Sequence, residues 1–417
     1  MNEQQRKIIE SNEKHILVLA GAGSGKTYTL IQKIKKIKST KLDSKILCLT
    51  FSNLAAKELK NRLRDETVDV FTFHGFCFKL IQPYISNKQV LFETPRQFTK
   101  QEILKISVER AKGAKKQSLL LKKYLDFLNK NSLFDFDDML LLCLNKLINL
   151  EIKVSYDYIL IDEVQDTNSV QFTILSYLIG KNTKTILVGD IDQGIYKFRG
   201  ASFDLIEKYR EHYRPKVLML TQNYRSAKAI VNCANRLIEK NQKRPDKTLF
   251  SDLKLSADIK IYLFSTILDF VKMLKNYLVV ARKNNENIQE ICVLVRRNQE
   301  RVLLENRLTN GFSLFEYVPK VYTVHESKGL EFKTVFIVGL NEGVFPDTKS
   351  GNLLDLEEER RLMYVAITRA KQNLYLVSFD FSLDGTKLKP SRFLKEIQWF
   401  AYLSGKSSKQ PRSRIFL

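Results

Sequence analysis

The sequence predicts an α/β fold made of two parallel sheets, each wrapped by helices, in tandem along the chain. Three observations support this prediction. Short apolar runs alternate with stretches of helical periodicity. A glycine-rich sequence stands between the first apolar run and the helix that follows it. The 417 residues are enough for two or three domains with cores of their own.

The apolar runs fall into two regions, and each run is rich in isoleucine, leucine and valine, as buried parallel strands are. The first region contains Ile16–Leu19, Ile46–Leu49, Tyr158–Ile161 and Thr185–Val188. The second region contains Lys216–Leu220, Ile259–Phe264, Ile291–Val295, Thr334–Val338 and Leu374–Val377. The polar segment Tyr209–Pro215 separates the two regions and predicts a hinge.

The segment 82–134 differs from both regions because it shows helical stretches, Phe98–Ala111 and Ser118–Leu128, and no clear strand. We expect a small helical insertion that divides the first domain into 1–81 and 135–214. The second domain is expected over 215–405. The basic, serine-rich tail 406–417 is expected to be disordered. The lysines of the insertion form either a basic binding face or a solvated helix face, and the sequence favours neither.

Composition and charge narrow the class of protein. Hydrophobic residues make up 44% of the chain and charged residues 28%, which is typical of a globular protein. No apolar run approaches the roughly 18 residues that span a bilayer, so no membrane partner is expected. Five widely spaced cysteines predict buried thiols in a reducing, cytoplasmic setting. The net charge of +23 favours either a nucleic-acid partner or a merely lysine-rich surface.

The glycine-rich sequence is the strongest functional signal. Its residues run Ala20, Gly21, Ala22, Gly23, Ser24, Gly25, Lys26 and Thr27. The glycines let backbone N–H groups turn toward an anion, Lys26 reaches the β- and γ-phosphates, and the Thr27 hydroxyl suits Mg²⁺. This pattern predicts a phosphate-binding loop and therefore binding of a nucleoside triphosphate.

Carboxylates follow a later strand of the same region. Asp162 and Glu163 come directly after Tyr158–Ile161, at the edge where parallel strands end together. Asp162 is expected to hold Mg²⁺ and Glu163 to polarise the attacking water. Gln165 lies just beyond them, and Gln193 follows the next strand, so both are placed to sense the γ-phosphate.

Two further groups of residues suit nucleic-acid binding and nucleotide hydrolysis. Tyr196, Phe198 and Arg199 interleave aromatic rings with positive charge, which favours base stacking beside phosphate contacts, or equally core aromatics beside a surface loop. Arg225 and Arg369 belong to the second region. If that region closes on the first, these arginines would stabilise charge on the γ-phosphate, as arginine fingers do.

Together these segments resemble the UvrD/Rep/PcrA family of superfamily 1 DNA helicases, in order over nearly the whole chain. The matching segments are Asn2–Gln5, Ala20–Thr27 (motif I), Thr50–Ala56 (Ia), Thr72–Gly75 (Ib), Asp135–Asp138, Asp162–Asn168 (II), Gly189–Gly200 (III), Asn223–Ser226 (IV), Thr323–Phe332 (V) and Tyr364–Lys371 (VI). The resemblance implies two RecA-like motor domains, called 1A and 2A, with the insertion as domain 1B.

The resemblance also implies individual roles. Gln5 would read adenine, Tyr224 would stack on it, and Glu331 would bind the ribose. The residues implied to line the path of single-stranded DNA are Phe51, Phe73, His74, Tyr196, Phe198, Arg199 and His325. The implied cofactors are ATP and Mg²⁺, and the implied translocation runs 3′ to 5′.

The chain departs from the family in one large respect. Family members usually carry a second helical insertion, 2B, between motifs IV and V, and only 100 positions separate Arg225 from His325, so 2B is expected to be absent or vestigial. The sequence therefore leaves two alternative functions open. One is a helicase acting on single strands and 3′-tailed duplexes. The other is a DNA-binding ATPase switch that serves a repair or nuclease partner and does not unwind alone. RNA stays open as a substrate.

Overall fold

The computed structural model describes residues 1–85, 89–112, 117–197, 200, 203–311, 318–347 and 353–397. Their contacts divide the chain into two compact units. The first unit contains Met1–Ala20 and Gly25–Leu220, and the second contains Gly21–Ser24 and the chain from Thr221 onward. Each unit is an α/β structure on a parallel sheet, which confirms the predicted fold class.

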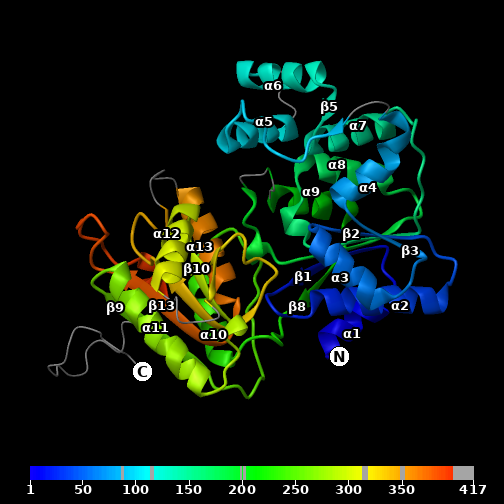
Figure 1. Ribbon diagram of the computed structural model, residues 1–417. Helices are drawn as coiled ribbons and strands as arrows, with labels where there is room; N and C mark the ends of the chain where they lie inside the picture. The colour runs from blue at the N-terminus through cyan, green and yellow to red at the C-terminus, as the bar shows by residue number, and fades with distance from the viewer. Residues whose placement is uncertain are drawn as a thin grey trace. The chain divides into compact units, whose positions relative to one another are not determined.

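The first unit is built on a six-stranded parallel sheet in the order β3-β2-β6-β7-β1-β8 (Figure 1). Its strands are β1 His15–Ala20, β2 Ile46–Thr50, β3 Val68–Thr72, β6 Tyr158–Ile161, β7 Lys184–Gly189 and β8 Lys216–Leu220. Residues 16–20 and 46–50 are buried without interruption, because helices cover both faces of the sheet.

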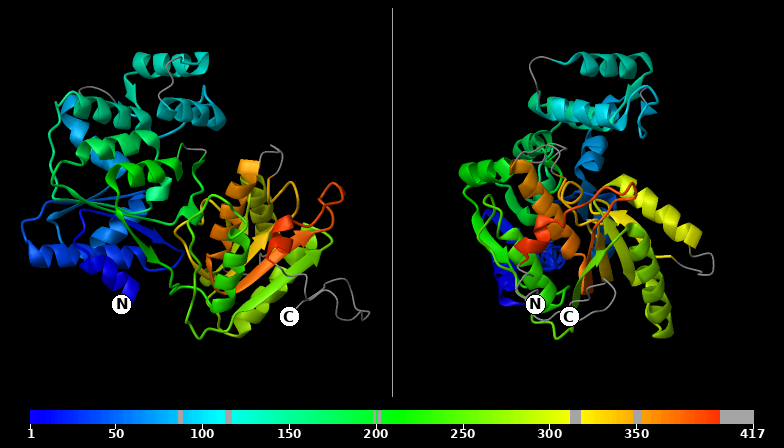
Figure 2. Two further views of the ribbon diagram at one scale, coloured as in Figure 1. Left: turned by 180° about the vertical axis from the view of Figure 1, so that it is seen from behind. Right: turned by 90° about the vertical axis from the view of Figure 1, so that its left-hand side faces the viewer.

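Two apolar cores lie on the two faces of this sheet. One face packs against α1 Glu3–Glu10, α2 Lys26–Thr40 and α3 Asn53–Leu63. The other packs against α4 Phe73–Ile81, α7 Phe136–Ile148, α8 Ser169–Leu178 and α9 Phe203–Tyr213 (Figure 2). Short 3-10 turns are η1 Gln82–Tyr84, η2 Val164–Asp166 and η3 Ile191–Gln193.

The insertion consists of α5 Lys100–Lys112 and α6 Leu119–Lys130. It also forms two-residue strands that the sequence did not predict, β4 Gln89–Val90 and β5 Leu133–Phe134. Arg110 of α5 ties the insertion to α7, because its buried guanidinium donates to Asp135 at 2.9 Å and to Asp138 at 2.5 Å. Of the insertion's lysines, which the sequence assigned to either a basic binding face or a solvated helix face, Lys115 and Lys116 and the Lys112 side chain lie outside the described residues.

The second unit has a five-stranded parallel sheet in the order β11-β10-β12-β13-β9. Its strands are β9 Asp258–Phe264, β10 Ile291–Val295, β11 Lys320–Thr323, β12 Phe332–Val338 and β13 Ala370–Phe379. α11 Ile267–Lys283 and α12 Asn298–Gly311 bury one face. α10 Lys228–Ile238 and α13 Leu353–Ile367 pack together against the other (Figure 2). The remaining elements are η5 Ile288–Glu290 and α14 Arg392–Glu396.

The structure corrects the expected domain boundary. β8 pairs with β1, with Leu17 opposite Val217, so this strand completes the first sheet and the second unit begins at Thr221 instead of at 215. The expected hinge at Tyr209–Pro215 is also wrong. Tyr209 of α9 is fully buried and hydrogen-bonds to Thr185 of β7, which fixes the start of this segment in the first unit.

Residues 226–311 form α10, β9, α11, η5, β10 and α12 of the second unit, so this described segment contains no separate domain. The tail 406–417 lies outside the described residues. All five cysteines are free and buried, as predicted. Within the described ranges, no helix is both long and apolar enough to cross a membrane.

Candidate nucleotide site and nucleic-acid interface

The glycine-rich loop leaves β1 at its carboxyl end and leads into α2. Gly23 and Gly25 have φ values of 65° and 79°, in the left-handed region that glycine adopts without strain. A Cβ atom at Gly23 would lie 2.8 Å from the Arg225 Cβ and 2.8 Å from the Asn223 Nδ2. Glycine is therefore required at this position for both its conformation and the space around it.

Lys26, the first residue of α2, forms a partly buried ion pair with Glu163. Its Nζ lies 2.9 Å from each carboxylate oxygen of Glu163. Burial by itself lowers the pKa of Lys26, but the attraction of Glu163, Asp190 and Asp162 outweighs burial and leaves this pKa raised. The ammonium that is predicted to bind phosphate is thus held among three carboxylates.

Asp162 is buried at the end of β6. Burial, and then the charge of Glu163, raise its pKa to about 7, although Lys26, the Glu163 N–H and the Thr27 hydroxyl act in the opposite direction. A buried carboxylate next to a threonine hydroxyl is a hard oxygen donor set, which fits Mg²⁺ when phosphates and waters complete its coordination. In the described part of the chain, no group of three or more His, Cys, Asp or Glu side chains is arranged to hold a metal.

Two glutamines connect the Lys26–Glu163 ion pair to Asp190, the residue after β7. Gln165 donates from Nε2 to Glu163, and its Oε1 accepts the Asp190 N–H at 3.0 Å. Gln193 donates to the Asp190 carboxylate at 2.7 Å. Glu163 itself has a φ of 56°, an uncommon value for a residue with a side chain. The structure thus brings Lys26, Glu163, Gln165 and Gln193 into one network.

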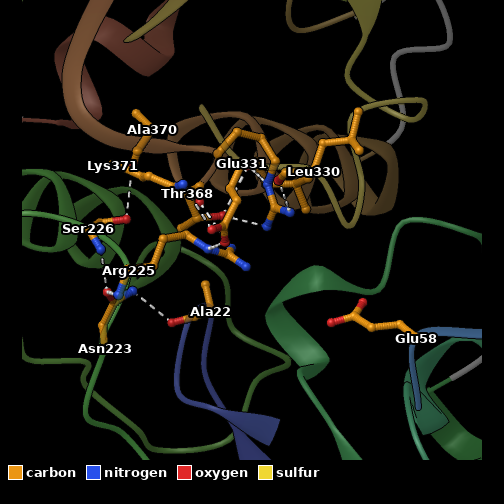
Figure 3. Close-up of polar contacts among 12 residues, drawn as sticks. Ala22, Glu58, Asn223, Arg225, Ser226, Leu330, Glu331, Thr368, Ala370 and Lys371 are labelled. Atoms are coloured by element: carbon orange, nitrogen blue, oxygen red, sulfur yellow. Dashed lines mark hydrogen bonds and ion pairs between the residues drawn. The ribbon is translucent and has the colours of Figure 1, made fainter. Parts of the chain in front are cut away.

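The loop also contacts the segment that contains Arg225. Asn223 donates from Nδ2 to the Ala22 carbonyl at 2.7 Å (Figure 3). The Tyr224 N–H donates to the Gly23 carbonyl at 2.8 Å. Asn223 also accepts hydrogen bonds from the N–H groups of Arg225 and Ser226. These contacts place the backbone of Arg225 directly beside the phosphate loop.

The predicted arginines meet around Thr368. Arg225 donates from Nη1 to the Thr368 carbonyl at 3.3 Å and pairs through Nε with Glu331 at 2.6 Å (Figure 3). Lys371 also pairs with Glu331 at 3.1 Å. Burial raises the pKa of Glu331, but the two cations outweigh burial and lower it. Arg369 is 1% exposed and donates to the Thr368 hydroxyl and to the carbonyls of Val365 and Leu330.

The residues predicted to contact the base lie at two separate places in the chain. Gln5 is 3% exposed, and its Nε2 lies 3.0 Å from the position of a Cβ atom at Gly25. A reciprocal capping box with Asn2 holds the first turn of α1, where Gln5 lies. Tyr224 belongs to the second unit and exposes 43% of its surface, so its ring is accessible for stacking.

Aromatic side chains line a pocket of about 370 Å³ in the first unit. Phe51, the residue after β2, stacks on Tyr196 with ring centres 4.9 Å apart. His74 of α4 packs edge-on against Phe136, and Phe136 packs against Phe92. The sequence reasoning missed Phe92 and Phe136. Their exposures of 76% and 43% are unusual for phenylalanine. Phe136 lies within the matching segment Asp135–Asp138, although no role was assigned to it, and no motif contains Phe92.

The other residues predicted to contact DNA are placed differently. Phe73 is 5% exposed and packs in the core with Phe76, so its position favours a packing role. His325 lies half-buried in the turn after β11. Phe198 and Arg199 lie outside the described residues.

The fold and the site together define a P-loop NTPase with two parallel-sheet units. The sequence profile of the UvrD/REP helicase N-terminal domain matches residues 1–118 and 91–214. That of the UvrD-like helicase C-terminal domain matches residues 218–318 and 310–380. The chain belongs to the UvrD-like helicase family. The two ranges matched by the C-terminal domain profile overlap at 310–318, between motifs IV and V, where domain 2B is expected to be missing.

Curated relatives are similar over most of the chain. A probable DNA helicase of Mycoplasma pneumoniae is 28% identical over 460 aligned positions, covering 95% of this chain and 87% of the relative. A probable DNA helicase II homolog of Mycoplasma capricolum is 25% identical over 631 positions with the same coverage. The ATP-dependent DNA helicase PcrA of Staphylococcus epidermidis is 30% identical, over 73% of this chain and 49% of PcrA.

Proposed function

We propose that the chain is an ATP-driven translocase that moves 3′ to 5′ on single-stranded DNA and unwinds 3′-tailed duplexes. The observation that carries the proposal is the contact of Ala22 and Gly23 with Asn223 and Tyr224. This contact sets the backbone of Arg225 beside the phosphate loop. Membership of a helicase family and the +23 net charge support DNA as the substrate.

Each polar group of the site has a proposed role in hydrolysis. When ATP binds, Lys26 leaves its ion pair with Glu163 and binds the β- and γ-phosphates. Glu163 is then free to polarise the attacking water. Thr27 and Asp162 hold Mg²⁺, which neutralises phosphate charge when bound. Gln165 and Gln193 both hydrogen-bond to Asp190, and these bonds rearrange when the γ-phosphate is lost.

The second unit supplies the remaining groups. Arg225 and Arg369 stabilise charge on the γ-phosphate once Arg225 releases Glu331. Glu331 then binds the ribose, while Tyr224 stacks on adenine and Gln5 reads its edge. We propose that the pocket lined by Phe51, His74, Phe92 and Phe136 takes bases of the single strand, since aromatic faces stack on any base.

The test is strand displacement by the purified chain on two matched duplexes, one with a 3′ tail and one with a 5′ tail. We expect ATP-dependent displacement of the 3′-tailed duplex alone, and no displacement by Lys26→Ala. Displacement of the 5′-tailed duplex would contradict the polarity. ATP turnover that DNA fails to stimulate would contradict the motor.

A second function is supported by the compact second unit, in which residues 226–311 form only the unit's own layers. The chain would then be an ATP-dependent DNA-binding switch for a repair or nuclease partner. DNA-stimulated turnover without displacement of either duplex, and displacement restored by a partner protein, would favour this function over the first.

A further inference from the structure

Lys33 of α2 is a buried ammonium that donates to two backbone carbonyls. It is 4% exposed, and its Nζ donates to the Ile9 carbonyl at 2.9 Å and to the Ser11 carbonyl at 2.5 Å. Among the described residues, no carboxylate pairs with it, and the nearby Lys36 and Lys184 repel it. Burying a charge without a counter-charge is unfavourable, so the two carbonyl bonds are the evident reason for a lysine here.

Both carbonyls belong to the end of α1. Ser11 is the C-cap of this eight-residue helix, and the last carbonyls of a helix have no partners within it and carry partial negative charge. A helix this short is not stable by itself. α1 is therefore held at its start by the capping box, along its side by the buried Ile8 and Ile9, and at its end by Lys33.

Lys33 and Lys26 lie on the same helix, seven residues apart. Seven residues make two helical turns, so both side chains leave the same face of α2. α2 thus carries the phosphate-loop lysine at its first residue and the tether to α1 two turns later. At the other end of α1, the Gln5 amide faces Gly25, the residue that precedes α2.

We propose that Lys33 is a positioning residue for base selection, which fixes α1 on α2 and so sets the place of Gln5 relative to the phosphate loop. The inference rests on the proposed reading of adenine by Gln5. A glutamine amide can pair with adenine at N6 and N7, whereas guanine offers an acceptor in place of the N6 donor. Such pairing tolerates little displacement, and a loosened α1 loses the preference for adenine.

The test compares kcat and KM for ATP and GTP, with saturating single-stranded DNA, in Lys33→Met, Lys33→Arg, Gln5→Ala and the control Lys36→Met. Lys36 lies on the same helix, and with Lys33 it lines a small cavity beside the end of α1, but its side chain is exposed. We expect Lys33→Met to lower the ATP-over-GTP ratio of kcat/KM about tenfold, through KM for ATP, as one lost hydrogen-bonded contact does. Lys33→Arg should restore the ratio, and Lys36→Met should leave it unchanged.

The double variant Lys33→Met with Gln5→Ala should match Gln5→Ala alone, because both changes remove the same contact. Selectivity that persists in Lys33→Met and is lost in Gln5→Ala overturns the inference and leaves the proposed role of Gln5 intact. Selectivity that persists in Gln5→Ala overturns both. Amide hydrogen exchange should rise in α1 for Lys33→Met and not for Lys36→Met. If Lys33→Met does not fold, Lys33→Gln takes its place.

Discussion

At the scale of single residues, the ion pair of Lys26 with Glu163 couples catalysis to stability. Lys26→Ala removes the ammonium that three carboxylates share, so it should abolish ATP turnover and lower the free energy of unfolding by about 3 kcal/mol. Adding Glu163→Gln removes one of those charges and should recover part of this loss. Urea unfolding of the two single variants and the double variant measures the coupling free energy between Lys26 and Glu163. Simple additivity of the two effects would contradict the pair.

The exposed ring of Phe92 allows a second prediction at this scale. Phe92→Ala should weaken binding of single-stranded DNA by about 1–3 kcal/mol, the range measured for stacking on one aromatic side chain. Because the ring is 76% exposed, the melting temperature should not change. Fluorescence anisotropy with a labelled oligonucleotide measures the affinity. Phe381→Ala, at an exposed phenylalanine of the second unit, is the matched control; an equal loss in both variants would rule out the pocket.

At the scale of elements, the sequence predicted the interior strands of both large sheets and the edge strands β8 and β9, and it missed the other two edge strands, β3 and β11. Ile46–Leu49 and Ile291–Val295 are continuous apolar runs, and both are strands. β3 and β11 were missed because neither contains more than two consecutive apolar residues, with Asp69 interrupting β3 and Lys320 beginning β11. β8 was recognised as a strand but assigned to the wrong sheet, because strand order in a parallel sheet does not follow chain order.

The α1–α2 tether predicts a pH dependence of stability. Burial, and then Lys184 and Lys36, lower the pKa of Lys33 to about 8, while Glu13 and Tyr158 line the same cavity. Between pH 8 and the ordinary lysine pKa, the unfolded chain binds more protons than the folded one, so stability rises with pH in this window. From about pH 8 to about pH 9.5 the gain is about 2 kcal/mol.

Urea unfolding of the parent and of Lys33→Met at these two pH values measures the gain as a difference, which cancels the other titrating groups. The parent should gain more stability than the variant as pH rises. The same gain in both proteins would show that Lys33 titrates normally.

At the scale of the whole molecule, the individual site residues were predictable but their grouping was not. The phosphate loop follows from spacing alone, because its turn requires glycines. Arg225 contacts Glu331 and Thr368, which lie 106 and 143 positions further along the chain, and Arg369 contacts the same Thr368. Arg225 and Arg369 were expected together from their place in the second region, whereas only the family resemblance indicated Glu331. The Lys33 tether matches no motif, because its acceptors are backbone carbonyls, which leave no trace in side-chain patterns.

The net charge of +23 supports the last prediction. If the positive charge serves DNA binding, affinity for an oligonucleotide should fall steeply with salt, because each neutralised phosphate releases counterions. Roughly five phosphate contacts predict a fall of about a hundredfold between about 50 and about 200 mM salt. Anisotropy titrations over this range, without nucleotide, give the slope. A morpholino strand of the same sequence lacks phosphate charge and should bind with little salt dependence. A DNA slope as shallow as that of the morpholino would assign the lysines to a solvated surface and leave stacking as the main contact.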